Sequence, residues 1–416
     1  MRTCRRKCFA FIFVVIIIAF ICYLYFCKFK QNVVIGIQQP VSYTSYSPLL
    51  VPGEQSGNER MDAQLGYTLS AKKRRGNDER NVSPNRSDAD ENVKSKPIRR
   101  RFKTLLIHNL MYLRPLKENQ GTFLEQNCPV NECLVTHDKT KHESVDAIFF
   151  YETVGISEKP KNSNQIWIYM TQESPNFNPS VRHLGNRINW TITYREDSTI
   201  VYPYLKYLYF IDSVRQRKQD VNYAKGKTKK VAWFTSNCCP TNNRMGYAEE
   251  LGKYIQVDIY GFCGTKTCTK TDDPICFEML EKEYKFYLAF ENSNCRDYIT
   301  EKFMRNALQH DVIPIVMGAH PDDYRKIAPE NSYIHYEDFN SAKELAAYLH
   351  KLDKNDTLYN EYFKWKGTGQ FYDVNLWCHV CSMLHHALDD KKQIWYENFG
   401  AWYAGKGVCI GKDRWT

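Results

Sequence analysis

Blocks of apolar and polar positions alternate along the chain, most clearly around one stretch in its second half. Phe286–Phe290 is an apolar run, a polar stretch follows it, and Val312–Met317 is a second apolar run. Tyr298, Glu301 and Lys302 stand at the front of an amphipathic segment between the two runs. This pattern is typical of two parallel strands joined by a loop and a helix. Such sheets bind ligands at the carboxyl ends of their strands, beside a helix N-terminus that favours anions.

Further apolar runs predict strands on both sides of a polar, basic segment from Gln216 to Lys230, which we interpret as a linker. Met245–Tyr254 and Ala342–Leu352 have helical spacing. The predicted fold class is therefore α/β, with two facing nucleotide-binding-type halves and a cleft between them. The predicted strands are Arg101–Ile107, Asp146–Tyr151, Gln165–Met170, Asn189–Tyr194, Lys230–Thr235 and Val257–Tyr260.

The apolar run of residues 9–27 predicts one transmembrane helix, because about 20 apolar residues span a bilayer. More basic residues precede the run than follow it, which places residues 1–8 in the cytosol and the rest of the chain in the lumen. A cleaved signal peptide is the alternative. Tyr23, Tyr25 and Phe26 stand where a cleavage site needs small residues, so a signal anchor is favoured.

Residues 28–101 have the composition of an unfolded stem, rich in Ser, Asn, Gln, Pro and charge. Lys72–Arg75 and Arg99–Arg101 carry much of the net charge of +10. Basic runs can bind nucleic acid, but a lumenal chain meets none, so we interpret them as solvated charge, with a processing site as a minor alternative. Residues 102–416 are enough for two domains of ordinary size.

The cysteines agree with a lumenal location. Four of the 15 lie in or beside the apolar run, and an odd number lies beyond it, so at least one of these is unpaired or pairs between chains. Cys378 and Cys381 form a Cys-X-X-Cys pair, which could bind zinc together with Cys128 and Cys133. Two disulfides are the favoured interpretation in an oxidising compartment.

Sequons, each only an opportunity for N-glycosylation, begin at Asn81, Asn85, Asn189 and Asn355.

The polar residues after Phe290 suit the binding of a nucleoside diphosphate sugar. Lys302 and Arg244 could neutralise a diphosphate, Glu301 could accept hydrogen bonds from sugar hydroxyls, and Tyr298 could pack on a base or sugar ring. The structural alternative is that Glu301 and Lys302 are ordinary solvated charges of a first helical turn. Their position directly after a buried strand favours the binding site.

Glu173 is the candidate general base. It follows the predicted strand Gln165–Met170 and precedes Ser174-Pro175, which restricts the turn. A carboxylate on a rigid turn at a domain edge suits proton abstraction. The structural alternative is a loop cap or an ion pair with Arg182.

Several common motifs are missing. The acidic pairs Asp272-Asp273 and Asp322-Asp323 are expected in polar loops, and no Asp-X-Asp resembles a metal site. Neither GxGxxG nor GxxxxGK[ST] occurs. A nucleotide site without a metal must neutralise its phosphates with side chains, a need that Arg244 and Lys302 fit.

Taken together, these segments resemble the α1,3-fucosyltransferases over roughly Thr104 to Leu388. The anchor and stem also fit that family's type II Golgi layout. The segments that carry the resemblance are Glu173-Ser-Pro, Asn189-Trp-Thr, Tyr194-Arg-Glu-Asp197, Ser236-Asn-Cys238, Arg244, Tyr260-Gly261, Phe290-Glu-Asn292, Tyr298-Ile-Thr-Glu-Lys302, Val312–Gly318 and Cys378 with Cys381.

The resemblance implies a GT-B fold of two Rossmann-like domains. It also implies inverting transfer of L-fucose from GDP-β-L-fucose, in α1,3 linkage, to GlcNAc of glycoprotein N-glycans. On this basis 102–215 is the acceptor-side domain, 228–365 binds the donor, and 366–416 returns to the first domain. By position, Glu173 matches the general base, and Arg244 and Lys302 match diphosphate ligands. The other matching donor contacts are Ser236, Asn237, Tyr260, Asn292, Tyr298 and Glu301, and the matching disulfides are Cys128–Cys378 and Cys133–Cys381.

The chain departs from the family pattern at two points. Many members carry an acceptor-side His at the position of Tyr151. The role of that His is therefore not carried over to this chain. Cys238-Cys239 replaces the Asn-Trp of Lewis-type members, and with Asn242-Asn-Arg244 the loop is closer to invertebrate and plant enzymes that fucosylate the N-glycan core. Core GlcNAc, a Lewis-type antenna and GalNAc-GlcNAc all stay open as acceptors.

Two other functions are weighed against transfer. One is a membrane-anchored glycan-binding protein with the same fold and no catalysis, and the other is a related enzyme with a different nucleotide-sugar donor. The presence of Glu173, Arg244, Glu301 and Lys302 argues against the first. No tightly bound cofactor, protein-held metal or nucleic-acid partner is expected. Stimulation by Mn²⁺ or Mg²⁺ and the oligomeric state stay open.

Overall fold

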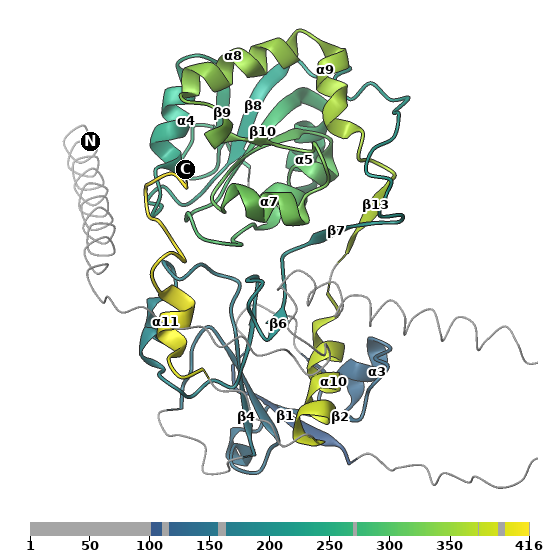
Figure 1. Ribbon diagram of the computed structural model, residues 1–416, viewed down its shortest axis with the longest axis vertical. Helices are drawn as coiled ribbons and strands as arrows, with labels where there is room; N and C mark the ends of the chain where they lie inside the picture. The colour runs from purple at the N-terminus through teal and green to yellow at the C-terminus, as the bar shows by residue number, and fades with distance from the viewer. Residues whose placement is uncertain are drawn as a thin grey trace, which may run out of the picture.

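Two parallel sheets form the protein, a computed structural model that describes residues 101–109, 116–156, 164–268, 273–372, 374–389 and 396–415 (Figure 1). The expected α/β class with two parallel sheets is confirmed. The predicted tail, anchor and stem, with the sequons at Asn81 and Asn85, lie outside the described residues. Within the described residues, no helix has the length and apolarity needed to cross a membrane.

The N-terminal sheet has the strand order β2-β1-β3-β4-β5-β6, and every pair of neighbours is parallel. The central strands β3 and β4 are almost fully buried, as their continuous apolar runs predicted, because parallel sheets are covered on both faces. The bounds are β1 Lys103–Ile107, β2 Cys133–Thr136, β3 Ala147–Tyr151, β4 Ile166–Met170, β5 Trp190–Thr193 and β6 Ile200–Val201.

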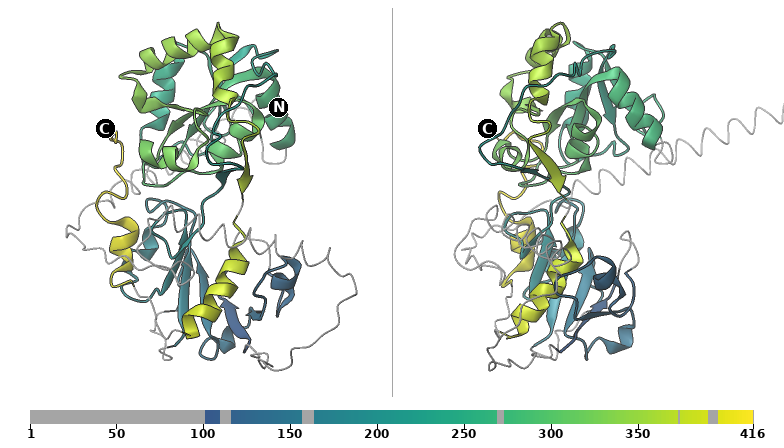
Figure 2. Two further views of the ribbon diagram at one scale, coloured as in Figure 1. Left: turned by 45° about the vertical axis from the view of Figure 1, so that its right-hand side comes forward. Right: turned by 90° about the vertical axis from the view of Figure 1, so that its right-hand side faces the viewer.

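The last part of the chain packs on this first sheet. Helix α10 (Leu376–Asp389) contacts α3 (Gly121–Glu125) and β1, and it contributes buried side chains to the same core as the strands. Helix α11 (Phe399–Ala404) packs against the 3₁₀ helix η2 (Pro179–His183). Figure 2 shows α10 and α11 beside the strands of the N-terminal sheet, although the C-terminal sheet precedes both helices in the sequence.

The C-terminal sheet has the strand order β12-β11-β10-β8-β9 and is also parallel throughout. Its central strand β10 is buried at every position. The strands are β8 Lys229–Phe234, β9 Val257–Tyr260, β10 Tyr284–Phe290, β11 Ile313–Met317 and β12 Ile334–His335, and the helices are α4 Arg244–Gly252, α5 Asp273–Glu283, α6 Glu301–Met304, α7 Pro321–Ile327, α8 Ala342–Asp353 and α9 Asp356–Asn360.

The helix expected after Tyr298 is short. Thr300 has an extended backbone, with φ −104° and ψ −170°, and α6 covers only Glu301–Met304. Thr300 is the residue directly before the helix, where an extended backbone is usual. Both its amide nitrogen and its hydroxyl donate to the buried Glu291 carboxylate. A four-residue helix has little dipole, so the expected anion site at its N-terminus is not supported.

The expectation that the acidic pairs lie in loops is also wrong for the residues that the structure describes. Asp273 begins α5, and Asp322 and Asp323 form the first turn of α7. There they suit a helix N-terminus, where negative charge is favourable, and Asp323 and His320 complete a capping box. Asp272 lies outside the described residues.

An antiparallel ribbon joins the two halves. Strand β7 (Lys206–Tyr209) pairs with β13 (Gly369–Tyr372), in register Tyr207 with Phe371, and Figure 1 shows the two strands between the sheets. The chain therefore leaves the N-terminal sheet and returns to it through adjacent strands.

Five disulfides lie within the described residues. Cys128–Cys378 and Cys133–Cys381 attach α10 to the N-terminal sheet, in the pairing that the resemblance implied. Three pairings that the sequence left undecided are Cys238–Cys263, Cys268–Cys276 and Cys295–Cys409.

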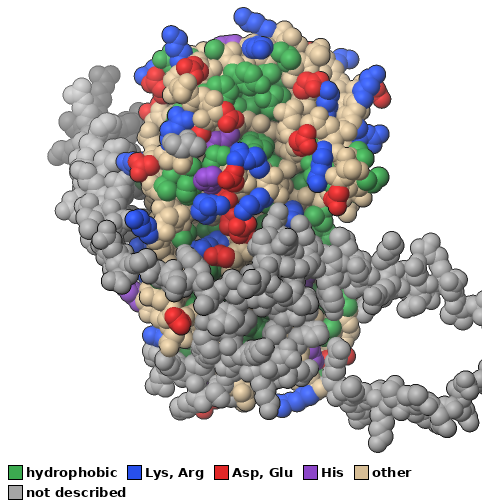
Figure 3. Space-filling view, viewed as in Figure 1, with side chains coloured by type: hydrophobic (Ala, Val, Ile, Leu, Met, Phe, Trp, Pro, Cys, Tyr) green, Lys and Arg blue, Asp and Glu red, His purple; other side chains and the backbone are tan. Residues whose placement is uncertain are grey.

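Figure 3 shows Lys and Arg side chains mixed with Asp and Glu on the visible face of the C-terminal half. A stripe of one sign, which is the mark of a nucleic-acid surface, is not seen on that face.

Candidate functional site

The loops that follow β4, β8 and β10 meet where the two halves touch. The contacts that join them are short: Ser174 Oγ lies 2.7 Å from Ser293 Oγ, and Asn176 Nδ2 lies 3.1 Å from Thr241 Oγ1. Because these loops leave the carboxyl ends of parallel strands, the meeting point is where α/β sheets bind ligands. It also brings Glu173 to the residues that follow β10.

Glu173 is held through its backbone. Its amide nitrogen donates to Thr171 Oγ1 at 3.1 Å, and its carbonyl accepts from the Tyr403 hydroxyl at 2.8 Å. The half-buried carboxylate accepts from the Tyr298 hydroxyl, with 3.2 Å to Oε2. A carboxylate held in this way keeps its position relative to the C-terminal half.

Tyr298 lies between the halves, and this corrects the expectation that its ring packs on a ligand. The side chain is 1% exposed, and its ring centroid lies 5.0 Å from that of Tyr194 of the N-terminal half. Burial raises the pKa of Tyr298 well above its ordinary value, so the phenol keeps its proton and donates to Glu173. The sequence contained no signal for this contact, since Tyr194 and Glu173 come from distant segments.

Lys302 is held by two carboxylates. Its Nζ lies 3.2 Å from Glu291, 3.1 Å from Glu301 and 2.8 Å from Thr300 Oγ1. Burial alone would lower the pKa of Lys302, but Glu291 and Glu301 raise it above its ordinary value, so the ammonium stays charged. Burial opposes ionisation of Glu301 as well, yet Lys302 holds the pKa of that carboxyl below its ordinary value.

The most deeply buried member of this group, Glu291, received no separate role from the sequence. It is 0% exposed, it follows β10 directly, and it accepts from Thr300 N at 2.8 Å. Burial raises its pKa, while Lys302 acts in the opposite direction. In the sequence, Glu291 is visible as a carboxylate next to a buried strand. Its partners Thr300 and Lys302 become its neighbours only in the folded chain.

Arg244, the first residue of α4, is almost fully buried below the same loops. Its guanidinium donates to the Phe290 carbonyl at 2.9 Å, the Asn237 carbonyl at 2.9 Å and Thr235 Oγ1 at 3.2 Å. Burial lowers the pKa of Arg244 relative to the ordinary arginine value. Its guanidinium therefore ties the end of β8 to the end of β10, and Nε has no hydrogen-bond partner among the described residues.

Asn292 shows a second buried polar atom without a partner. Its side-chain Oδ1 makes no hydrogen bond within the described part of the chain, while its carbonyl accepts from Thr241. An unsatisfied buried polar atom costs about 1–3 kcal/mol, which a partner from outside the chain can offset. Asn292 and Arg244 are thus two places where a bound molecule can supply the missing contact.

The remaining predicted donor residues differ in how they are placed. Ser236 is exposed, and Asn237 accepts from the Cys239 amide, in a loop tied by Cys238–Cys263 to the segment after β9. The Tyr260 side chain points into the core, where its hydroxyl lies 2.7 Å from that of Tyr284, so a ligand contact through this side chain is not supported.

Asn189 is another correction. It is 0% exposed, and its Oδ1 accepts from the Trp167 amide at 2.7 Å, so a glycan at Asn189 is incompatible with this fold. Asn355 is exposed and precedes α9, where its side chain accepts from Leu358 N at 3.1 Å. The sequon pattern could not separate these two positions.

Tyr151, which the resemblance places on the acceptor side, is half-buried at the end of β3, and its amide donates to Asn109 Oδ1 at 2.8 Å. Glu152 follows with φ +58°, an uncommon conformation for a residue with a side chain. Burial, and then the charge of Glu173, raise the pKa of Glu152. Two carboxylates therefore share this edge of the N-terminal sheet.

Within the described residues, one group of possible metal ligands is close enough to share an ion: Cys133, Cys381 and His385. Both sulfur atoms belong to the disulfide Cys133–Cys381, so this group has no thiolate to offer a metal.

Comparison with protein families gives two matches. Residues 102–205 match the family described as fucosyltransferase, N-terminal, and residues 224–402 match the C-terminal part of glycosyltransferase family 10 (fucosyltransferase).

Individual proteins give similar results. Glycoprotein 3-alpha-L-fucosyltransferase A of Drosophila melanogaster is 48% identical over 75% of this chain and 62% of its own length. The chain thus spans less than two thirds of that relative. Alpha-(1,3)-fucosyltransferase C of the same species is 33% identical over 67% of this chain and 71% of its own length. A solved α1,3-fucosyltransferase with GDP is 17% identical with a TM-score of 0.44, over 75% of this chain and 96% of that one.

Proposed function

Since the chain belongs to glycosyltransferase family 10, the fucosyltransferases, we propose that it transfers L-fucose from GDP-β-L-fucose to GlcNAc of glycoprotein N-glycans, in α1,3 linkage and with inversion. The observation that carries the proposal is the contact between Glu173 and Tyr298. It puts a carboxylate of the N-terminal half against the loop of the C-terminal half that bears Glu301 and Lys302.

In the proposed reaction, Glu173 removes the proton from the 3-hydroxyl group of GlcNAc. The hydroxyl oxygen attacks C1 of fucose from the face opposite to GDP, the bond between C1 and the diphosphate oxygen breaks, and GDP leaves with the electron pair. General base catalysis of this kind contributes about 10²- to 10⁴-fold to the rate. The half-buried position of Glu173 and the hydrogen bond from Tyr298 support this role.

Lys302 and Arg244 are proposed to stabilise the charge that develops on the leaving diphosphate. The Glu301 carboxylate, with 43% of its side chain exposed, now occupies one side of the Lys302 ammonium. A diphosphate oxygen would replace it there, and Glu301 would then accept from a fucose hydroxyl. Asn292 Oδ1 and Arg244 Nε, which lack partners in the described chain, are buried, so the donor would reach them only after these side chains shift.

The domain roles follow from this assignment. We propose a GT-B arrangement in which residues 102–215 bind the acceptor, residues 228–365 bind the donor, and residues 366–416 return to the first domain. The return of α10 and α11 to the N-terminal sheet supports that division. A type II Golgi location agrees with the apolar run at 9–27 and with the disulfides.

For the acceptor, we favour the GlcNAc residues of the N-glycan core. The relative from Drosophila, whose name describes a glycoprotein 3-alpha-L-fucosyltransferase, supports a glycoprotein acceptor. Product mapping on defined N-glycans, with and without antennae, tests the choice. Fucose found only on antennary GlcNAc would refute the core assignment.

Purified full-length protein in detergent is expected to release GDP from GDP-fucose only when a GlcNAc acceptor is present. Glu173→Gln should lower kcat by about 10²- to 10⁴-fold and leave the Kd for GDP within about twofold. GDP binding without transfer to any member of a broad glycan panel would exclude the enzyme activity. No GDP binding in calorimetry would instead indicate a glycan-binding protein.

A further inference from the structure

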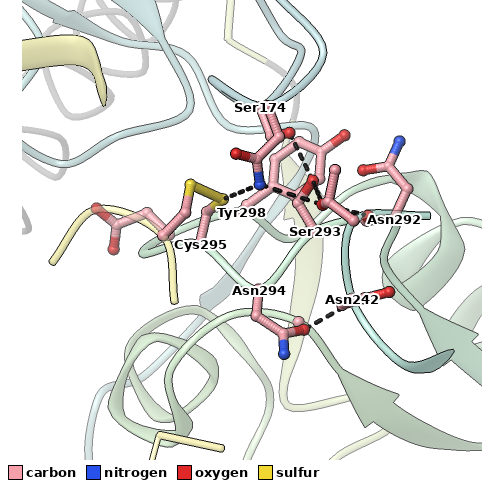
Figure 4. Close-up of a disulfide and its surroundings, with 12 residues drawn as sticks. Ser174, Asn242, Asn292, Ser293, Asn294, Cys295 and Tyr298 are labelled. Carbon is pink, nitrogen blue, oxygen red and sulfur yellow. Dashed lines mark hydrogen bonds between the residues drawn. A yellow bond between two sulfur atoms is a disulfide. The ribbon is translucent and has the colours of Figure 1, made fainter. Parts of the chain in front are cut away.

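The turn after β10 bonds to the loop that bears Glu173 through hydroxyl groups. Ser293 Oγ, in a side chain that is 0% exposed, lies 2.7 Å from Ser174 Oγ and 3.0 Å from Thr241 Oγ1. Thr241 Oγ1 in turn lies 3.1 Å from the Asn292 carbonyl oxygen. Figure 4 shows Ser174 and Ser293 facing each other across the junction, beside Asn292 and Tyr298.

The directions of these hydrogen bonds can be assigned, because a hydroxyl group has only one hydrogen to donate. The Asn292 carbonyl can only accept, so the Thr241 hydroxyl donates to it. Ser293 must then donate to Thr241, and Ser174 must donate to Ser293. The bonds therefore run one way, from the residue next to Glu173 to the backbone of Asn292.

Two further contacts hold the same turn. Asn176 Nδ2, from the loop after β4, donates to Thr241 Oγ1 at 3.1 Å, which uses the remaining acceptor site of that oxygen. On the other side, the disulfide Cys295–Cys409 attaches the turn to the C-terminal segment, as Figure 4 shows. Each hydroxyl hydrogen of Ser174, Ser293 and Thr241 is thus used in a bond within the protein, and none is left to donate to a ligand.

We propose that Ser174 and Ser293 are positioning residues that fix the distance between the general base and the donor site. Ser174 is the immediate neighbour of Glu173, and Ser293 is the immediate neighbour of Asn292. The inference rests on the proposed function, since it assigns Glu173 and Asn292 to the two substrates. Neither serine touches a substrate in this assignment, and each acts through the residue next to it.

The expected effect is on turnover rather than on binding. A displacement of about 1 Å in a reacting group can cost about 10²-fold in rate. Loss of the Ser174–Ser293 bond leaves each loop attached to its own sheet, so the donor site keeps its residues. We therefore expect kcat to fall about 10- to 100-fold, with the KM for GDP-fucose and the Kd for GDP nearly unchanged.

The test uses Ser174→Ala, Ser293→Ala and the double variant of the full-length protein, each measured for kcat, donor KM, GDP affinity and Tm. Ser332→Ala is the matched control, because Ser332 is equally buried and donates to the Pro329 carbonyl at 2.7 Å, away from the junction. Each single variant should lose kcat, and the double variant should lose little more than either one. Ser332→Ala should keep kcat.

The outcomes are separable from those of the proposed function. An inactive wild-type protein would remove the fucosyltransferase assignment itself. An active wild type with unchanged kcat in Ser174→Ala and Ser293→Ala would overturn only the positioning role. A parallel loss of GDP affinity would make Ser293 a donor-binding residue and also overturn it. Should both alanine variants fail to fold, Thr241→Val breaks the same chain at a less buried position, and an unchanged kcat there decides against the proposal.

Discussion

The Tyr298 hydroxyl donates to Glu173 Oε2 across 3.2 Å, although the two residues are 125 positions apart and belong to opposite halves. A tyrosine that stands among the expected donor residues thus bonds to the expected base. Glu173 therefore depends on both halves for its position, and a change in either half should alter turnover.

Tyr298→Phe removes this hydrogen bond and keeps the ring that packs on Tyr194. A hydrogen bond to a charged group is worth about 1.5–3 kcal/mol, so Tm should fall by a few degrees. Because Glu173 also loses a contact that positions it, we expect kcat to fall by about 10- to 100-fold. Steady-state kinetics and thermal unfolding provide the measurement. Tyr324→Phe is the control, because Tyr324 is equally buried and its hydroxyl has no partner among the described residues. Equal kcat values for the two variants would contradict the role of the Tyr298 hydroxyl.

Lys302 and Glu291 allow stability and donor binding to be separated. Lys302→Met leaves the buried Glu291 carboxylate without its ammonium, which should lower the free energy of unfolding by about 3–5 kcal/mol. It should also raise the KM for GDP-fucose by at least about tenfold.

The double variant Lys302→Met with Glu291→Gln removes both charges and keeps the amide oxygen as an acceptor for Thr300. It should recover most of the lost stability and none of the donor affinity. Urea unfolding and GDP calorimetry test the two effects. Donor affinity that returns together with stability would mean that Lys302 has only a structural role.

Asp297 predicts a pH dependence of stability. It accepts from the Glu196 amide of the N-terminal half at 3.1 Å. Burial, then Asp323 and Glu196, raise its pKa from 3.8 to about 7. The folded state therefore holds a proton that the unfolded chain releases, and the stability this contributes is present below pH 3.8 and lost as the pH rises through about 7.

Asp297→Asn imitates the protonated form and keeps an acceptor for the Glu196 amide. The variant should be more stable than wild type above about pH 7, and the difference should vanish toward about pH 4. Tm measured across this range tests the prediction, with the exposed Asp212→Asn as control. A pH-independent difference would show that Asp297 is not the titrating group.

Glycan mapping of the folded full-length protein from a eukaryotic host should find no glycan at Asn189. Its side chain is fully buried and bonded to the Trp167 amide, so a glycan there prevents folding. Asn355 is exposed and keeps its capping oxygen when its nitrogen is glycosylated. Peptide mass spectrometry should therefore detect glycan at Asn355, and occupancy of Asn189 would contradict the packing of β4 on β5.

The strands were predictable wherever burial made a continuous apolar run, as in Ile166–Met170 and Tyr284–Phe290. Short or partly exposed strands have too few consecutive apolar residues to be recognised in the sequence. The pair β7 and β13 was missed for this reason. Its two strands are also separated in the sequence by the whole C-terminal sheet.

The site was predictable as a set of residues and less so as an arrangement. Glu173, Lys302 and Glu301 stand next to strand ends, a position visible in the sequence. The role of Thr300 was not visible, because the Glu291 carboxylate to which its amide nitrogen and hydroxyl donate becomes its neighbour only in the folded chain.

The two disulfides that attach α10 to the N-terminal sheet limit how early the N-terminal half can finish folding. Cys128 and Cys133 are separated from their partners by 250 and 248 positions. A chain that enters the lumen during translation exposes these thiols long before Cys378 and Cys381 arrive, while the strands of the C-terminal sheet appear in between. The half that is synthesised first therefore stays open until α10 has been made, and its early cysteines need protection from premature partners such as Cys238 or Cys263.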